Sequence, residues 1–210
     1  MNEKSLIILL SGVLAVCAVS IIYLVSNNAQ SPAVMTKSGA VSTVKTATPI
    51  GGAFEMVDQN GQTVTEKEFA GKYKLMFFGF THCPGICPGE LTKISTVLDI
   101  LEEDNQADKI TPIFVSIDPA RDTPEVMKEY VETYDRRFVG LTGSQEQVDK
   151  MKNDYKVHAS KVEMEMMEPG NYMMDHSTFT YLMSPQNELM LVFDMQDKPQ
   201  EIAEEIRASL

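Results

Sequence analysis

The feature that most constrains this chain is a pair of cysteines, Cys83 and Cys87, in the run FGFTHCPGICP, where a hydrophobic strand should give way to a helix. If Cys87 lies in the first helical turn, the i, i+4 spacing puts both sulfurs on one face, with Cα atoms roughly 6 Å apart. At that separation the two residues can share a metal ion or form a disulfide. Two thiolates form a soft, metal-seeking pair, and the helix N-terminus should lower the pKa of at least one of them.

A second feature is the apolar run from Leu6 to Val25, which has about the length needed to cross a hydrocarbon core of ~30 Å. We predict that residues 1–26 are an uncleaved, single transmembrane anchor, with a cleaved secretory signal as the alternative. Cys17 lies inside the span, and the residues before it make a poor lipoprotein box, so we expect a passive membrane cysteine. Because no Arg-rich amphipathic presequence precedes the span, a bacterial inner membrane with the C-terminal domain in the periplasm fits better than a mitochondrial inner membrane facing the intermembrane space.

Residues 27–49 are mostly Ser, Thr, Ala, Val and Lys without periodicity, which predicts a flexible tether. Residues 50–210 are long enough for one domain with a real core. The formal net charge of −12 lies almost wholly in this domain and argues against nucleic acid as a partner. In an oxidising compartment, its lone cysteine pair is either bridged or kept reduced for a purpose.

Periodicity, capping boxes and turn residues predict the order of the elements. A hairpin (54–57 and 62–64) and a short capped helix (65–68) precede a buried strand (74–80) and a helix (88–104). Strand 110–117, helix 124–134, strand 138–141 and helix 144–155 follow, and then strands 157–164, 178–183 and 188–193 and a helix from 198. This order is typical of an α/β, thioredoxin-like fold with an N-terminal β-hairpin extension. It places Cys83 and Cys87 at the C-terminal edge of a strand, where α/β sheets usually hold their sites.

Three segments carry a family resemblance: the Cys-x-x-x-Cys-Pro turn, the run VSIDPARDTPE at 115–125, and Asp175-His176-Ser177 followed by a strand. Together they resemble the Sco/SenC family of membrane-tethered, thioredoxin-like copper chaperones. The resemblance implies a metallochaperone for the dinuclear copper site of cytochrome c oxidase subunit II, served by a copper donor and a thiol reductant. It also implies Cys83, Cys87 and His176 as the metal ligands. Gly85 stands where the family commonly has Asp, which removes a local acid but no ligand.

The donor set supports copper as the cofactor on chemical grounds. Two thiolates suit Cu(I), and an added imidazole makes a set that can also hold Cu(II). Zinc is the competing metal, but a structural zinc site normally has four ligands and only three are evident. Asp175 could orient the site or simply be a solvated loop carboxylate.

The other candidate residues have plainer interpretations. His82 should point away from Cys83 on an extended segment, and His158 has no partner that the sequence can name. Asp118, Arg121 and Asp122 are expected to shape the loop after a strand through a buried ion pair, with partner docking as the alternative.

Five methionines precede His176 in what the sequence predicts to be a loop: Met164, Met166, Met167, Met173 and Met174. Thioethers bind Cu(I), so these residues could form a transfer path. We favour the alternative that they form an adaptable hydrophobic surface over the site or against a partner.

A second class of function remains open: a thiol-disulfide oxidoreductase in which Cys83 and Cys87 are the catalytic redox pair and keep the cysteines of an oxidase subunit reduced. Reductants of this fold generally have two residues between their cysteines, and this turn has three, which favours metal binding. Otherwise no enzymatic activity is expected. The chain lacks the Thr that a peroxidase of similar fold has before its attacking Cys. A purely structural disulfide would close too small a loop to stabilise the domain much.

Overall fold

The computed structural model describes residues 34–35, 41–42, 49–163 and 172–210. The predicted anchor therefore lies outside the described residues, as do most of the predicted tether and Met164, Met166 and Met167. Among the residues that are described, no helix is long and apolar enough to cross a membrane. Within the predicted tether, β1 (Val34–Met35) and β2 (Val41–Ser42) pair as two short antiparallel strands.

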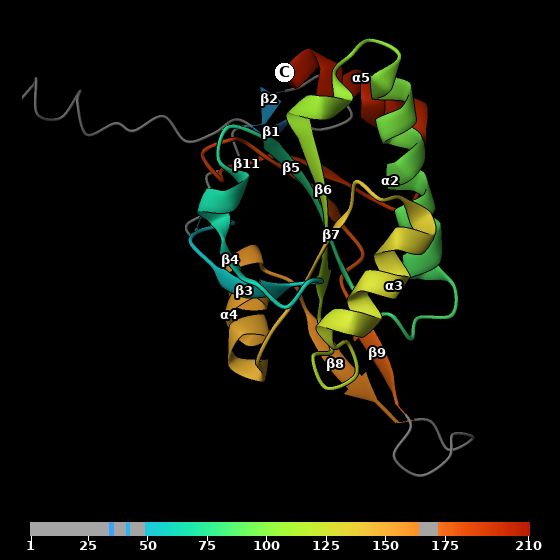
Figure 1. The fold of residues 1–210 in the computed structure, drawn as a ribbon. Helices are drawn as coiled ribbons and strands as arrows, with labels where there is room; N and C mark the ends of the chain where they lie inside the picture. Colours follow the sequence, from blue (N-terminus) through green and yellow to red (C-terminus); the bar gives the residue numbers. More distant parts are fainter. Residues whose placement is uncertain (1–33, 36–40, 43–48, 164–171) are drawn as a thin grey trace, which may run out of the picture. The chain divides into compact units, whose positions relative to one another are not determined.

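The core of the domain is a seven-stranded mixed sheet with the order β11-β10-β5-β6-β7-β3-β4 (Figure 1). Its three central strands, β5, β6 and β7, are parallel, and the outer strands pair antiparallel to their neighbours. The strands are β3 (Glu55–Asp58), β4 (Thr63–Thr65), β5 (Tyr73–Gly79), β6 (Ile110–Ser116), β7 (Val139–Thr142), β10 (Thr180–Met183) and β11 (Leu189–Phe193). The predicted hairpin extension is β3 and β4, and β3 joins it to the sheet through β7.

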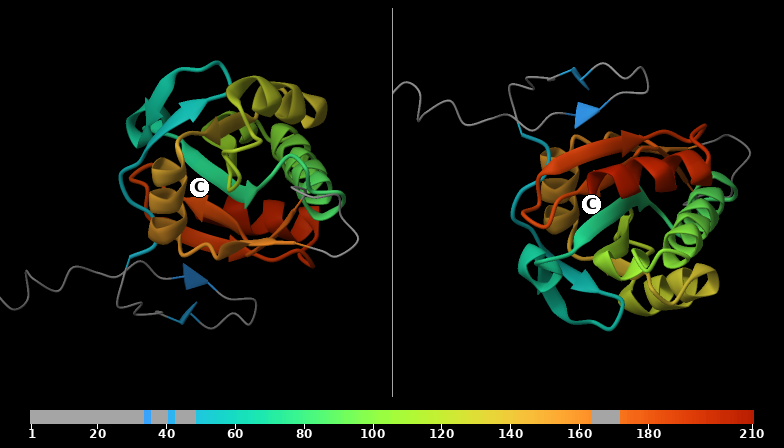
Figure 2. Two further views of the ribbon diagram at one scale, coloured as in Figure 1. Left: turned by 90° about the horizontal axis from the view of Figure 1, so that it is seen from below. Right: turned by 90° about the horizontal axis from the view of Figure 1, so that it is seen from above.

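Helices cover both faces of this sheet. They are α2 (Ile86–Glu102), α3 (Pro124–Tyr134), α4 (Gln145–Tyr155) and α5 (Pro199–Ser209), with short 3-10 turns η1 (Glu66–Phe69) and η2 (Ala107–Lys109). Figure 2 shows α4 on one face and α2, α3 and α5 on the other. Alternate residues of β5 serve the two faces: the ring of Phe78 lies 5.3 Å from that of Tyr155 in α4, whereas Phe77 stacks on Phe114, which contacts Tyr130 of α3.

The sequence signals at helix starts are confirmed. Thr123 caps α3 by accepting from the backbone N–H of Val126, and Ser144 and Gln147 form a reciprocal capping box at α4. Helix α2 begins at Ile86, two residues before the predicted start at Pro88. Cys87 therefore lies in the first turn of that helix, as the spacing of the cysteines required.

One strand was missed. Residues Met173–His176 form β9, which pairs antiparallel with β8 (Ala159–Val162) in a separate two-stranded sheet. The prediction of a methionine loop up to His176 is therefore wrong for Met173 and Met174, which are half-buried strand residues packed against the core. The β8–β9 hairpin lies at the end of the central sheet where α2 and α3 begin (Figure 1).

Candidate metal centre

The cysteine pair lies in the turn that joins β5 to α2. Cys83 is 9% exposed and Cys87 is fully buried, and both are free thiols. The backbone N–H of Cys87 donates to Sγ of Cys83 at 3.4 Å, while the N–H of Cys83 donates to the carbonyl of Phe80. The turn thus holds Cys83 over the start of the helix, where backbone N–H groups that have no partner within the helix point at its sulfur.

The two thiols have opposite acidities. A hydrogen bond from the Cys87 side chain, helped by backbone N–H groups of Cys87, Gly85 and Ile86 and opposed by burial, lowers the pKa of Cys83 to about 5. The same side-chain interaction, together with burial, raises the pKa of Cys87 far above its usual value. At neutral pH the pair is therefore one thiolate, Cys83, beside one thiol, Cys87. The direction agrees with the expectation that at least one cysteine pKa is lowered, but the largest cause is the Cys87 side chain, and the backbone N–H groups of the helix start contribute less.

His176, the last residue of β9, faces this pair. Its Nε2 lies 3.9 Å from Sγ of Cys87, and its Nδ1 lies 2.8 Å from the carbonyl oxygen of Ser177. A carbonyl oxygen can only accept, so Nδ1 carries the proton and Nε2 of the neutral ring presents its lone pair toward the sulfur. Edge-on contacts with Phe77 and Phe80 hold the ring plane. The structure thus places His176 beside Cys87, with Cys83 in the same turn as Cys87.

The spacing suits a soft metal ion shared by sulfur and nitrogen. Typical metal–sulfur and metal–nitrogen bonds of ~2.3 and ~2.05 Å, joined at a tetrahedral angle, separate the two donors by about 3.6 Å. The separation of 3.9 Å between Cys87 Sγ and His176 Nε2 is a few tenths of an ångström wider. Within the described part of the chain, no three His, Cys, Asp or Glu side chains are already gathered as a metal-binding group. A bound ion would therefore need these side chains to move closer together.

A half-open cavity of about 270 Å³ gives access to Cys83 of the pair. Its wall combines the cysteine turn with the β9 hairpin and is mostly apolar; it includes Cys83, Ile86, Met173, Met174 and His176. Ile86 is 45% exposed at the rim. A metal held here would be shielded from bulk water on one side and open to a docking partner on the other.

The remaining histidines make their contacts elsewhere, whereas Asp175 lines the same cavity as Cys83. The His82 ring is half-exposed and turns toward Asp122, with Nδ1 3.1 Å from Oγ1 of Thr81 and 4.0 Å from Oδ1 of Asp122. His158 is exposed, and its backbone N–H donates to Ser177 Oγ. Asp175 is exposed in the middle of β9.

The predicted ion pair in the loop after β6 is confirmed as that of Arg121 with Asp118, whose side chain is 1% exposed. Asp122 is not part of this ion pair. Its buried carboxylate accepts hydrogen bonds from Oγ of Ser116 and from Oγ1 and the backbone N–H of Thr81, at 2.6, 2.6 and 3.3 Å. It therefore ties the end of β6 to the residues that lead into the cysteine turn. Burial raises the pKa of Asp122, against these hydrogen bonds.

Sequence reasoning missed two residues around the site. A methyl group added at Gly79 would lie 2.7 Å from Sγ of Cys87 and 2.8 Å from the Phe114 ring, so only glycine fits beneath the sulfur. Tyr172 joins the hairpin to the Asp118–Arg121 pair through its hydroxyl. The glycine stands in the quoted FFGF run, but no local pattern signals the contact of Tyr172.

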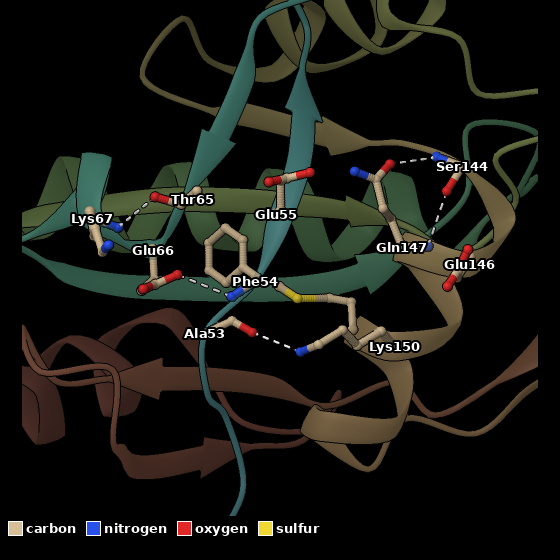
Figure 3. Close-up of a pocket in the computed structure, with 11 residues that line it drawn as sticks. Ala53, Phe54, Glu55, Thr65, Glu66, Lys67, Ser144, Glu146, Gln147 and Lys150 are labelled. Carbon is tan, nitrogen blue, oxygen red and sulfur yellow. Dashed lines mark hydrogen bonds between the residues drawn. The ribbon is translucent and has the colours of Figure 1, made fainter.

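A larger hollow of about 730 Å³ lies elsewhere, between the β3–β4 hairpin and the start of α4 (Figure 3). Several of its polar groups bond one another: Glu66 accepts from the N–H of Phe54, Lys150 donates to the carbonyl of Ala53, and Gln147 bonds Ser144. Its geometry serves to seat the hairpin, and it carries none of the proposed ligands.

The fold and the site define a thioredoxin-like protein with a Cys-x-x-x-Cys turn and a facing imidazole. The chain belongs to the SCO1/SenC family, whose family model matches residues 42–210. It is 39% identical over 172 residues to the "SCO2-like protein" of Rickettsia felis, covering 82% of each chain.

The comparison with solved structures agrees with this family assignment. The chain is similar to Bradyrhizobium japonicum ScoI with copper bound, at 42% identity and a TM-score of 0.69, covering 77% of this chain and 99% of that one. It is also similar to yeast Sco1 with copper bound, at 32% identity and a TM-score of 0.69, covering 76% of this chain and 87% of that one. The mixed α/β, thioredoxin-like Sco fold is thereby confirmed.

Proposed function

We propose that this protein is a copper carrier that holds one ion between Cys83, Cys87 and His176. The observation that carries the proposal is the approach of His176 Nε2 to within 3.9 Å of Cys87 Sγ, from a strand far along the chain. The bond from Nδ1 to Ser177 O keeps the free lone pair on that side, as is usual for metal-binding histidines. Copper in solved Sco structures supports the choice of metal.

The number of side chains that bind copper would depend on its oxidation state. Cu(I) is satisfied by the two thiolates, and binding it displaces the proton that Cys87 holds at neutral pH. Cu(II) needs the harder imidazole nitrogen as well. The site should therefore accept both states, with His176 contributing mainly to Cu(II).

The cargo is proposed to go to the dinuclear copper site of cytochrome c oxidase subunit II. The proposal rests on family membership, and the apolar rim formed by Ile86 and Met174 offers a surface for docking. Residues 1–26 would anchor the domain to a bacterial inner membrane with the copper site in the periplasm. A copper donor and a thiol reductant are required as further partners, because copper binds only when the cysteines are reduced.

Copper titration of the reduced full chain tests the ligand set. We expect one Cu(II) per chain with a sulfur-to-copper charge-transfer band, and His176→Ala should change that band and weaken Cu(II). His158→Ala is the matched control, because its exposed ring lies outside the site, and should leave the titration unchanged. A His176→Ala protein with the unaltered Cu(II) spectrum would refute the three-ligand site.

A thiol-disulfide exchange function is the second candidate, favoured by the Cys83 pKa of about 5. The Cys83 thiolate would attack a disulfide of the oxidase subunit and form a mixed disulfide, releasing one partner thiolate. Cys87, after loss of its proton, would then attack Cys83 Sγ, release the second partner thiolate and leave a Cys83–Cys87 disulfide. Each cycle oxidises the pair by two electrons and needs a thiol reductant to restore it.

The two candidates differ in their dependence on His176. Exchange should run in copper-free protein and should be equally fast in His176→Ala, whereas the binding and delivery of Cu(II) should weaken in that variant. Rates with a disulfide-bonded peptide of subunit II, measured beside copper transfer to the reduced peptide, separate the two. Fast exchange with no copper transfer would favour the oxidoreductase.

A further inference from the structure

We propose that Tyr172, Asp118 and Arg121 form a latch that positions His176 for Cu(II). This inference rests on the proposed copper-binding function and adds the residues that hold the third ligand in place. We call these three residues the Tyr172 latch. None of them is a metal ligand in the proposal, and each is a positioning residue.

The latch consists of direct contacts between the start of β9 and the loop after β6. The Tyr172 hydroxyl donates to Oδ1 of Asp118 at 2.7 Å, and Arg121 Nη1 donates to the carbonyl oxygen of Tyr172 at 3.1 Å. Arg121 Nε donates to the other Asp118 oxygen, and the guanidinium lies 3.8 Å from the centre of the Tyr172 ring. Tyr172 is therefore held through its hydroxyl, its ring and its backbone carbonyl together.

The latch is fixed to the rigid part of the domain. Asp118 is 1% exposed, and its backbone carbonyl accepts from the N–H groups of Arg121 and Asp122. Asp122 is itself tied to Ser116 at the end of β6 and to Thr81 before the cysteines. The same short loop thus braces both the turn with the thiols and the hairpin with the imidazole.

The hairpin needs such a brace because its strands hydrogen-bond only to each other among the described strands. At its far end, Ser177 and His158 exchange hydrogen bonds that hold the residue after His176 to β8. At its near end, Tyr172 immediately precedes β9, and His176 follows four residues later. Removing the latch would free the start of β9 from the loop after β6, so that β9 would be held only by β8, by its C-terminal end and by the packing of its methionines against the core.

A second contact connects the latch to the imidazole. The Arg121 guanidinium lies 5.8 Å from the centre of the Phe80 ring, and the Phe80 ring lies edge-on, 5.8 Å from that of His176. Arg121 therefore touches both the strand that carries His176 and a ring against which His176 packs. Displacing Arg121 would loosen the imidazole from both sides.

This arrangement predicts an effect that depends on the oxidation state of copper. If the thiolates alone suffice for Cu(I), a loosened His176 should weaken Cu(II) and leave Cu(I) nearly unchanged. Changes to outer contacts of metal ligands typically cost about 10- to 100-fold in affinity, and we expect that range for Cu(II) with Tyr172→Phe. A general loss of structure would instead weaken both ions.

The experiment compares Cu(II) and Cu(I) affinities and the Cu(II) electron paramagnetic resonance spectrum in the reduced full chain. Tyr172→Phe removes only the hydroxyl of the latch. Tyr155→Phe is the matched control, since that hydroxyl bonds Asn187 and its helix packs on the opposite face of the sheet. We expect Tyr172→Phe alone to lower the Cu(II) affinity and broaden the spectrum, with the Cu(I) affinity within about twofold of the native value.

A double-mutant cycle with His176→Ala assigns the effect. Once His176 is gone, Tyr172→Phe should cost nothing further in Cu(II) affinity. An equal cost in both backgrounds, an equal loss of Cu(I), or a Cu(II) affinity no lower than that of Tyr155→Phe would overturn the latch. Asp118→Asn, which weakens the same contacts from the acceptor side, gives an independent second variant and should show the same selectivity.

The outcome for the latch is separate from the outcome for the proposed function. A native chain that binds no copper would defeat the copper-carrier proposal itself. A native chain that binds Cu(II) through His176, combined with an unaffected Tyr172→Phe protein, would defeat the latch alone.

Discussion

Substituting Gly79 by Ala should both destabilise the domain and disturb the cysteine pair. The new methyl carbon would lie 2.7 Å from Cys87 Sγ and 2.8 Å from Phe114 Cε2, whereas ordinary contacts begin near 3.4 Å. About 0.7 Å must therefore be gained by moving a fully buried sulfur in the first turn of α2 and a buried ring in β6. Overpacking of this kind costs about 1–3 kcal/mol, against a gain of about 0.5–1 kcal/mol from replacing a glycine within a strand.

From the middle of these two ranges, the net expectation is a loss of about 1 kcal/mol in the free energy of unfolding. With an m-value of about 2 kcal/mol/M, the urea midpoint should fall by about 0.5 M. Gly89→Ala is the control: Gly89 lies exposed in α2, a methyl group there meets nothing within 4 Å, and the helix should gain up to about 1 kcal/mol.

The clash with sulfur can be isolated by repeating Gly79→Ala in a Cys87→Ala background. Removing Sγ eliminates the shorter contact, so the cost of the methyl group should fall by roughly half, with the Phe114 contact remaining. A Gly79→Ala protein as stable as the native chain would show that Cys87 Sγ does not lie over this glycine. An identical cost in both backgrounds would locate the strain at Phe114 only.

Three further predictions concern buried ionisable groups. The thiolate absorbance of Cys83 should titrate with a midpoint near pH 5 and should be lost in Cys83→Ser. Cys87→Ala should move that midpoint upward because it removes the main hydrogen bond, and an unmoved midpoint would contradict the assignment. The stability that comes from the lowered pKa is present above pH 9 and is lost as the pH falls through 5. Asp122→Ala should lower the free energy of unfolding by about 3 kcal/mol, because the buried hydroxyl of Ser116 and the half-buried hydroxyl of Thr81 lose a charged acceptor. A change below about 1 kcal/mol would argue against this network. Burial lowers the pKa of Lys74, so the unfolded chain binds more protons than the folded one, and stability should rise with pH toward 10.5. Lys74→Met should abolish that part of the rise when denaturation is measured at several pH values across this range. Parallel curves of stability against pH for the two proteins would exclude a contribution from Lys74.

Local patterns in the sequence predicted most of the fold. The capping residues Thr65, Thr123 and Ser144 mark helix starts because their side chains bond backbone groups only a few residues away. The central strands β5 and β6 were found because strands buried on both faces are continuously apolar. Strand β9 was missed because its methionines suggested an adaptable surface and because its partner β8 ends at Val162, too far back in the sequence for a tight-turn signal to join the two strands.

The candidate site was only half predictable from local chemistry. The thiol pair follows from spacing alone, since Cys83 and Cys87 share one turn and one helix N-terminus. The approach of His176 depends on how a hairpin 89 residues away in sequence folds back, and only the family resemblance suggested it. The Tyr172 latch could not be foreseen at all, because a contact between residues 54 apart leaves no trace in local periodicity.

The division of the donors between two elements suits a carrier better than a permanent metal site. The thiols lie on the rigid strand-to-helix turn, where Gly79 and Asp122 fix the backbone around them. The imidazole lies on a small separate sheet that is held at its two ends by side chains and turn contacts. A metal bound by all three could lose one ligand through a local movement of β9 without unfolding the core, which opens a coordination position for the ligand of a recipient. Hydrogen exchange should therefore report faster opening for amides of β9 than for those of β5, and equal protection in the two strands would mean that release needs a different movement.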